Sequence, residues 1–215
     1  MSAPSVVPLE ELELDALTEL VNLGISQAAH SLAEMAREEV TLTVPQVKIV
    51  FREEAIRIVS ERESNKLVAV HQVFEGDITG RALLIFPEAQ SFELVRAVVG
   101  SELDVDEIIE LEQEALAETG NIMLNGCLAT IANHLQRSLK ISLPEVLHGD
   151  SNELFNLEPP PPPGDLVMFI YINFALRHRE VNGYIAMLLD MPSMAALKAL
   201  LRDYIGRVAG DVPAE

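Results

Sequence analysis

Apolar residues in two segments of this sequence recur with the spacing of a helix that buries one face. In the first segment the apolar positions are Leu17, Val21, Ile25, Ala28, Leu32 and Met35. In the second segment they are Leu116, Met123, Leu124, Cys127, Ile131 and Leu135. Because a helix turns by about 100° per residue, each set gathers on one side of its helix. The sequence therefore predicts two amphipathic helices that pack against a core.

Short apolar runs bounded by Gly, Pro and Asn predict strands after each of these helices. The expected strands are 44–50, 66–76 and 80–87 after the first helix, and 143–149, 166–176 and 183–192 after the second. A further helix follows each set, at 91–100 and at 193–206. The connection from Gly76 to Gly80 is short enough for an antiparallel hairpin, and its counterpart is the turn at 177–183. The order helix, three strands, helix thus occurs twice.

This duplication predicts an α+β fold with pseudo-twofold symmetry. We expect one domain spanning 1–215, with repeat halves at about 9–100 and 101–208 and a joint near Gly100. Three strands alone would leave a small sheet, so the halves are expected to share one six-stranded, mainly antiparallel sheet covered by helices. Between their first and second strands the halves differ, with a charged link at 52–65 and a run of five prolines at 159–163. The proline run is expected to be a stiff extended spacer.

Composition narrows the possible partners. The 215 residues include 34 Asp and Glu but 15 Lys and Arg, a formal charge of -19 that repels nucleic acid and anionic lipid. One cysteine excludes an internal disulfide, and the five histidines show no metal-site spacing, so no metal or other cofactor is expected. The N-terminus lacks a secretory signal, and the longest apolar run, 166–176, is about half the length of a membrane span. We expect a cytoplasmic protein that binds neither nucleic acid nor membrane.

The polar faces of the two predicted helices carry the same spacing of acid, acid and amide. Asp15, Glu19 and Asn22 are repeated 99 residues later as Glu114, Glu118 and Asn121. Pro45 and Pro144 each follow the Asn by 23 positions. Polar residues on an exposed helix face usually do no more than contact solvent. The repetition does not prove a function either, because duplication of one half would copy the motif whether or not it had a role. The chemistry therefore has to be argued from the residues themselves.

Two acids one turn apart repel each other unless a cation lies between them, and neither motif supplies that cation. A Lys from a partner would relieve this repulsion, and an amide can hold a water with one donor and one acceptor. No nucleophile, base or metal cluster accompanies these groups in the sequence. The set suits hydrolysis of a reactive phosphoryl group that a partner carries.

The spacing D-x-x-x-E-x-x-N, followed by 22 residues and then P, resembles the signature of the CheC, CheX and FliY chemotaxis phosphatases. Asp15, Glu19, Asn22 and Pro45 fit it completely, whereas Glu114 stands where the family has Asp or Ser. Two copies in a chain of this length are most similar to the two-site CheC type. The segments 22–35 and 121–135 also resemble the small, Ala-rich continuation of the family's motif helices.

The resemblance implies a protein phosphatase in chemotaxis, a form of two-component signalling. Its substrate would be the aspartyl phosphate of a CheY-type response regulator, which carries its own Mg²⁺ and active-site Lys. Glu19 and Glu118 would pair with that Lys, Asn22 and Asn121 would orient the attacking water, and Asp15 and Glu114 would support docking.

Two other readings remain open. One is a non-catalytic adaptor that binds a response regulator or a CheD-type deamidase. In either case we expect the protein itself to be a monomer. The other is a flagellar switch component of the FliY type. That reading is disfavoured because such proteins carry an additional C-terminal switch domain, and the sequence runs only nine residues beyond the last expected helix.

Overall fold

The computed structural model describes residues 9–36, 39–63, 66–99, 105–157, 166–176 and 179–210. Gly100 and the proline run 159–163 lie outside these ranges. Helices and an antiparallel sheet confirm the α+β class. The described elements are α1 (Glu11–Ala36), β1 (Val40–Phe51), α2 (Arg52–Arg62), β2 (Leu67–Gly76), β3 (Gly80–Pro87), α3 (Glu88–Val99), α4 (Val105–His134), β4 (Leu139–Ile141), β5 (Glu145–Gly149), α5 (Ser151–Phe155), β6 (Leu166–Leu176), β7 (Arg179–Leu189) and α6 (Met191–Gly210).

The strands form one antiparallel sheet in the order β1, β6, β7, β3, β2, β4, with β5 also paired to β2. The sequence predicts six strands, and the described part of the chain has seven. The additional strand is the three-residue β4, which pairs with the end of β2 while β5 pairs with its beginning. The two short strands therefore follow one another along the same edge of β2. β2 and β3 form the hairpin expected around Gly76 and Gly80.

The sheet order interleaves the two halves of the sequence. β1 pairs with β6, β5 pairs with β2, and β3 pairs with β7 at the centre. From either edge, the order is the first strand of one half, then the second and third strands of the other half. Each outer strand thus depends on the opposite half for its hydrogen bonds, so neither half can complete its own sheet.

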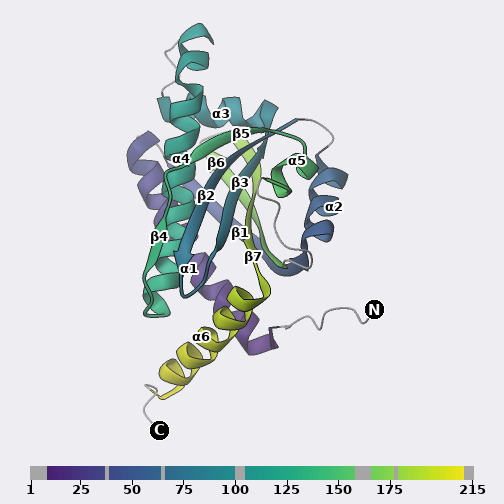
Figure 1. The fold of residues 1–215 in the computed structure, drawn as a ribbon. Coiled ribbons are helices and arrows are strands. Elements are labelled where there is room, and N and C mark those ends of the chain that lie inside the picture. Colours follow the sequence, from purple (N-terminus) through teal and green to yellow (C-terminus); the bar gives the residue numbers. More distant parts are fainter. Residues whose placement is uncertain are drawn as a thin grey trace.

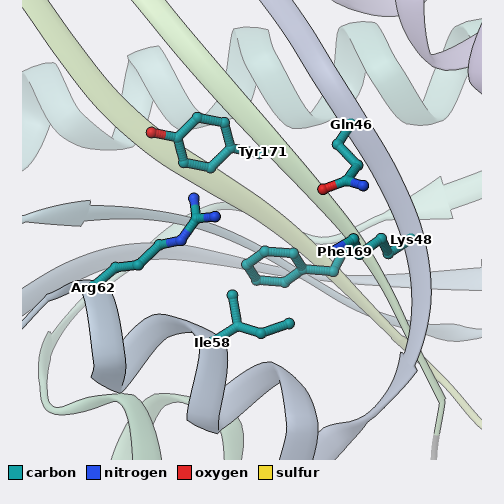
Figure 2. Close-up of a pocket in the computed structure, with 6 residues that line it drawn as sticks. All are labelled: Gln46, Lys48, Ile58, Arg62, Phe169 and Tyr171. Carbon is teal, nitrogen blue, oxygen red and sulfur yellow. The ribbon is translucent and has the colours of Figure 1, made fainter.

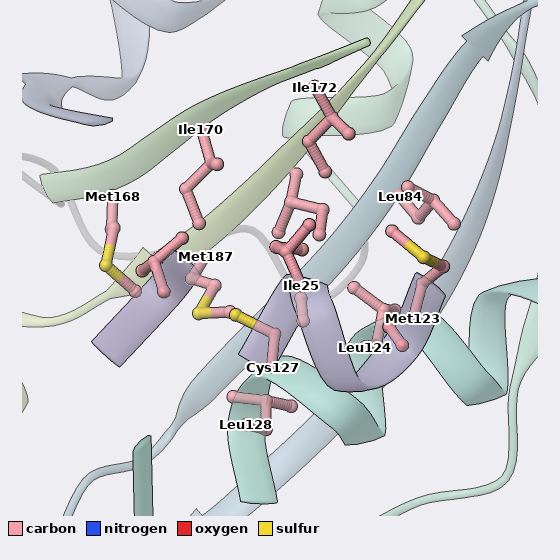
Figure 3. Close-up of a cluster of buried hydrophobic side chains, with 14 of the residues drawn as sticks. Ile25, Leu84, Met123, Leu124, Cys127, Leu128, Met168, Ile170, Ile172 and Met187 are labelled. Carbon is pink, nitrogen blue, oxygen red and sulfur yellow. The ribbon is translucent and has the colours of Figure 1, made fainter. Parts of the chain in front are cut away.

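Helices cover both faces of the sheet (Figure 1). The larger core lies between one face and α1, α3, α4 and α6. Figure 3 shows part of it, where Ile25 of α1 and Cys127 of α4 meet side chains of β6 and β7. The smaller core lies on the other face, under α2 and α5. The helix faces predicted from the apolar pattern are buried here, with Met35 only half-buried.

Helix α2 replaces most of the charged link that we expected at 52–65. Only Ala55 and Val59, one turn apart, are buried from this helix. Its outer surface is held by Arg57, which donates to Glu54 Oε1 at 2.6 Å and to Glu61 Oε1 at 2.9 Å. Such pairs at spacings of three and four residues stabilise a helix. The expectation was wrong because a narrow apolar stripe was hidden among charges.

Helices α1 and α4, which carry the two polar motifs, cross in close contact. A Cβ on Gly24 would lie 2.8 Å from Cys127 Cα, nearer than side chains normally approach backbone. Gly126 and Ala28 meet at the same crossing. Small residues therefore let the two backbones touch and fix the relative position of the motif helices.

Buried His71 in β2 should make stability depend on pH. Its Nδ1 lies 3.4 Å from Glu145 Oε2, and its Nε2 is buried with no hydrogen-bond partner among the described residues. Burial lowers the pKa of His71 below its usual value of 6.5; Arg81 acts in the same direction and Glu145 opposes it. As pH falls below 6.5, the unfolded state takes up this proton first, so stability is lost.

We expect His71→Gln to reduce the loss of thermal stability between pH 7.5 and pH 5. The measurement is Tm across that range for the wild type, the variant and His30→Gln, a control at an exposed histidine of α1. The control should follow the wild type. Equal slopes for His71→Gln and the wild type would show that His71 does not titrate in this way.

Candidate functional site

The four motif carboxylates lie on exposed surface of the two crossing helices. Asp15 and Glu19 are exposed on α1, and Glu114 and Glu118 are exposed on α4. Within the described ranges, none of the four accepts a side-chain hydrogen bond or forms an ion pair. Their negative charge is therefore available to a cation of another molecule.

The start of α1 is anchored beside the first motif by the buried carboxylate of Glu13. Arg202 Nε of α6 lies 2.6 Å from Glu13 Oε1, and Lys198 Nζ lies 3.5 Å from Glu13 Oε2. Burial acts to raise the pKa of Glu13, but the hydrogen bonds from the Glu10 N–H and from Arg202, with both cations, hold it below its usual value. Lys198 and Arg202 thus form ion pairs within the fold and stabilise the first turn of α1, which precedes Asp15.

The two motif amides differ in their surroundings, although both are half-buried and not fully exposed as the sequence suggested. Asn121 Oδ1 accepts two hydrogen bonds, from Gln72 Nε2 at 3.2 Å and from Asn125 Nδ2 at 2.7 Å. Asn22 makes no side-chain hydrogen bond to any described residue. The Asn121 amide is therefore hydrogen-bonded to the sheet, whereas the Asn22 amide has no such bond to a described residue.

The orientation of the Asn121 amide follows from the groups behind it. Gln72 is fully buried, and its Nε2 also donates to the carbonyl oxygen of Ser142 at 2.9 Å. Since a carbonyl can only accept, this contact fixes which end of the Gln72 amide is the donor. Asn121 must then present its oxygen to Gln72, and its Nδ2 is directed away.

The difference between the amides arises from how closely α4 approaches the sheet. A Cβ on Gly120 would lie 2.4 Å from Val70 Cβ, so only glycine permits this distance. The corresponding residue of α1, 99 positions earlier, is Val21, whose side chain is buried. The sequence analysis did not single out Gly120, yet this residue lets α4 approach β2 closely enough for Asn121 to reach Gln72.

The sheet register shows that the first motif has no counterpart of Gln72. Val47 of β1 pairs with Ile170, and Val146 of β5, 99 positions after Val47, pairs with Val70. Ile170 and Val70 are therefore equivalent. Two residues further along each strand, the position of Gln72 is occupied by Ile172, a buried side chain without a donor.

The described part of the chain has neither a cluster of metal-ligating side chains nor a helix suited to a membrane. Its His, Cys, Asp and Glu side chains form no group of three or more that could hold a metal ion. None of its helices is long and apolar enough to cross a membrane.

Comparison with known proteins agrees with the motif and the fold. The CheC-like family model matches residues 12–49, which include Asp15, Glu19, Asn22 and Pro45. The CheY-P phosphatase CheC of Bacillus subtilis (strain 168) is 28% identical over 144 residues, covering 64% of this chain and 67% of that protein. The flagellar motor switch phosphatase FliY of the same organism is 23% identical over 180 residues, covering 83% of this chain and 46% of that protein. This chain thus spans about half the length of that FliY.

The crystal structure of Thermotoga maritima FliY shares the fold, with a TM-score of 0.71 at 18% identity, covering 93% of this chain and 98% of that one. The motif segment is thus similar to the CheC-like family, the curated relatives carry the same kind of similarity beyond it, and the fold is that of the FliY structure.

Proposed function

We propose that this protein accelerates hydrolysis of the aspartyl phosphate on a CheY-type response regulator. The observation that carries this proposal is the pair of acid and amide motifs on two crossing helices, with carboxylates that are exposed and unpaired within the described chain. The name of the B. subtilis relative, CheY-P phosphatase CheC, supports the same substrate class.

In the proposed complex, Glu19 or Glu118 forms an ion pair with the regulator's active-site Lys, and Asp15 or Glu114 supports docking one turn away. The Asn of that motif then holds a water in line with the phosphorus atom. The water oxygen attacks phosphorus as the bond to the aspartyl oxygen breaks, giving inorganic phosphate and a free carboxylate. The regulator's own Mg²⁺ supplies charge neutralisation at the phosphoryl oxygens. This chain contributes positioning, which can raise a rate greatly without any covalent step.

The hydrogen bonds of the two amides favour unequal sites. To aim the oxygen of a water at phosphorus, an amide oxygen has to accept one of the water's hydrogens. Asn121 Oδ1 already accepts from Gln72 and from Asn125, so both of its lone pairs are engaged. Asn22 carries no such bonds to described residues. We therefore propose that the Asn22 motif is ready for turnover and that the Asn121 motif must first release an internal hydrogen bond.

Charge reversal at the motif glutamates should weaken docking. We expect Glu19→Lys and Glu118→Lys each to raise the Kd for the regulator by about tenfold, because like charges would then face each other. The measurement is calorimetric titration with the Mg²⁺-bound regulator. Glu53→Lys is the matched control, an exposed acid on α2 at the opposite face. An unchanged Kd in both motif variants would remove the proposed ion pair.

The proposed activity is tested by the loss of aspartyl phosphate from a Mg²⁺-loaded, phosphorylated CheY-type regulator from the same cell. We expect faster loss in the presence of this protein, with many regulator molecules turned over by each molecule added. Binding without acceleration would contradict the phosphatase proposal and favour the adaptor reading.

A further inference from the structure

A pocket of about 410 Å³ opens on the face of the sheet opposite the motif helices. Its wall residues come from β1, β6 and α2, and its volume lies in the range of small-molecule sites. Figure 2 shows side chains from both sides of this space directed into it. The lining residues are Gln46, Lys48, Ile58, Arg62, Phe169 and Tyr171.

The charge of this pocket is opposite to that of the protein. Lys48 and Arg62 are exposed lining residues, and none of the described lining residues is acidic, although the chain as a whole carries -19 and Glu54 of α2 lies near enough to Lys48 for their charges to interact. Lys48 comes from β1 and Arg62 from the end of α2, so the two cations reach the space from different walls (Figure 2). Local positive charge from two sides attracts an anion strongly.

The floor of the pocket is aromatic and rigid. Phe169 is 4% exposed, and its ring centroid lies 5.4 Å from that of buried Tyr184. Tyr184 is held in turn by a 2.7 Å hydrogen bond from its hydroxyl to Glu63. Ile58 adds an apolar wall from α2. Ile58 and Tyr171 are partly exposed beside Phe169, and their apolar surface is available to a flat ring of a ligand.

Arg62 joins the aromatic floor to the anion site. Its guanidinium carbon lies 4.9 Å from the centroid of the Tyr171 ring, which is a cation–π contact. Stacking uses the face of the guanidinium and leaves its N–H groups at the rim. No side-chain hydrogen bond from Arg62 to another described residue occupies them. These donors are positioned for a planar array of oxygen acceptors.

The other half of the fold lacks this chemistry. The repeat places Glu145 and Leu147 where the first half has Gln46 and Lys48. Because Ile170 is equivalent to Val70, Phe169 corresponds to Ala69 and Tyr171 corresponds to His71. There His71 lies against Glu145, and α5 packs over the surface. The pocket is therefore specific to the place where β1 and α2 of the first half meet β6 of the second half, and the equivalent place beside β5, α5 and β2 does not repeat it.

We propose that this pocket binds a nucleotide of the size of a nucleoside monophosphate. The base would lie against the apolar lining formed by Ile58, Phe169 and Tyr171, and the phosphate would lie between Lys48 and Arg62. A phosphate group carries up to two negative charges and three acceptor oxygens, which suits two cations better than a single carboxylate does.

The test is calorimetric titration of the full chain with AMP and with UMP, each compared with adenosine, which lacks the phosphate, and with ribose 5-phosphate, which lacks the base. We expect a Kd below about 1 mM for at least one nucleotide and binding at least about tenfold weaker for adenosine and for ribose 5-phosphate. Lys48→Gln and Arg62→Gln should each weaken nucleotide binding by about tenfold. Both side chains are exposed, so Tm should change little.

Arg137→Gln, in the turn after α4, and Lys140→Gln, in β4, remove the same charges at exposed positions outside the pocket and should leave the affinity unchanged. No binding of either nucleotide would overturn the proposal. Ribose 5-phosphate binding as tightly as AMP and UMP would also overturn it, because the site would then attract any phosphate. An equal loss of nucleotide affinity in the pocket variants and in the control variants would overturn it for the same reason. None of these results depends on phosphatase activity.

Discussion

Replacing both motif amides, as Asn22→Ala with Asn121→Ala, is expected to reduce the dephosphorylation of the regulator to the regulator's own rate. Without an amide in the partner's active site, no group of this chain holds the attacking water. Every tenfold loss corresponds to about 1.4 kcal/mol of lost transition-state stabilisation. The measurement is the single-exponential decay of aspartyl phosphate at saturating amounts of wild type or variant, with the Kd for the regulator measured in parallel.

The fold should survive this double substitution. Asn22 has no side-chain bond to a described residue, and Ala is the better helix former by about half a kcal/mol. Asn121→Ala leaves the Asn125 amide without its acceptor and costs about 1 kcal/mol. Asn133→Ala, at an exposed position of α4, is the matched control and should keep full activity. A double variant that folds, binds and still accelerates hydrolysis as the wild type does would remove the catalytic role of both residues.

The two single variants separate the sites. We expect Asn22→Ala to remove the larger share of the activity, because the Asn121 oxygen is engaged with Gln72 and Asn125. A larger loss in Asn121→Ala would mean that the internal hydrogen bonds prepare the second amide for its task and do not occupy it.

Much of the fold could be predicted because its signals are periodic. The buried faces of α1 and α4, the hairpin of β2 and β3 and the duplicated order of elements all follow from apolar spacing. The interleaving of the halves could not be predicted, because strand pairing across the repeat is decided by packing in three dimensions. Short elements also escaped: β4 has three residues, and α5 has five.

One of these short elements had a local signal. Asp150 and Glu153 form a reciprocal capping box at the start of α5, with both hydrogen bonds at 2.9 Å. An Asp followed three residues later by Glu is a sequence signature of a helix start. It could have been used to predict this helix in front of the proline run.

The motif acids and amides could be named from the sequence, but the support behind Asn121 was missed. Gln72 lies between Val70 and Phe74 on the same face of β2, and both of these residues are buried in the larger core. A polar residue on an otherwise apolar strand face is a signal that a hydrogen-bond partner lies above it. That partner came from a helix distant in sequence, so the contact itself needed the structure.

Gly120→Val is expected to destabilise the protein and to break the contact between Asn121 and Gln72. The substitution gives α4 the residue that α1 has at Val21. A Cβ at this position would lie 2.4 Å from both Val70 Cβ and Val70 Cγ1, so the helix has to move away from β2. Overpacking of a core typically costs about 1–3 kcal/mol. Val is a better helix former than Gly by only a few tenths of a kcal/mol, so the steric cost dominates.

The measurement is the free energy of unfolding by urea, with Gly206→Val as control. Gly206 also lies within a helix, but a Cβ there would meet nothing within 4 Å, so this variant should be as stable as the wild type or slightly more stable. Because α4 moves away from the sheet, Asn121 should lose its bond to Gln72, and the side-chain amide resonances of both residues should shift in the NMR spectrum. If Gly120→Val were as stable as Gly206→Val, α4 would not approach the sheet as closely as the structure indicates, and the difference between the two amides would lose its physical basis.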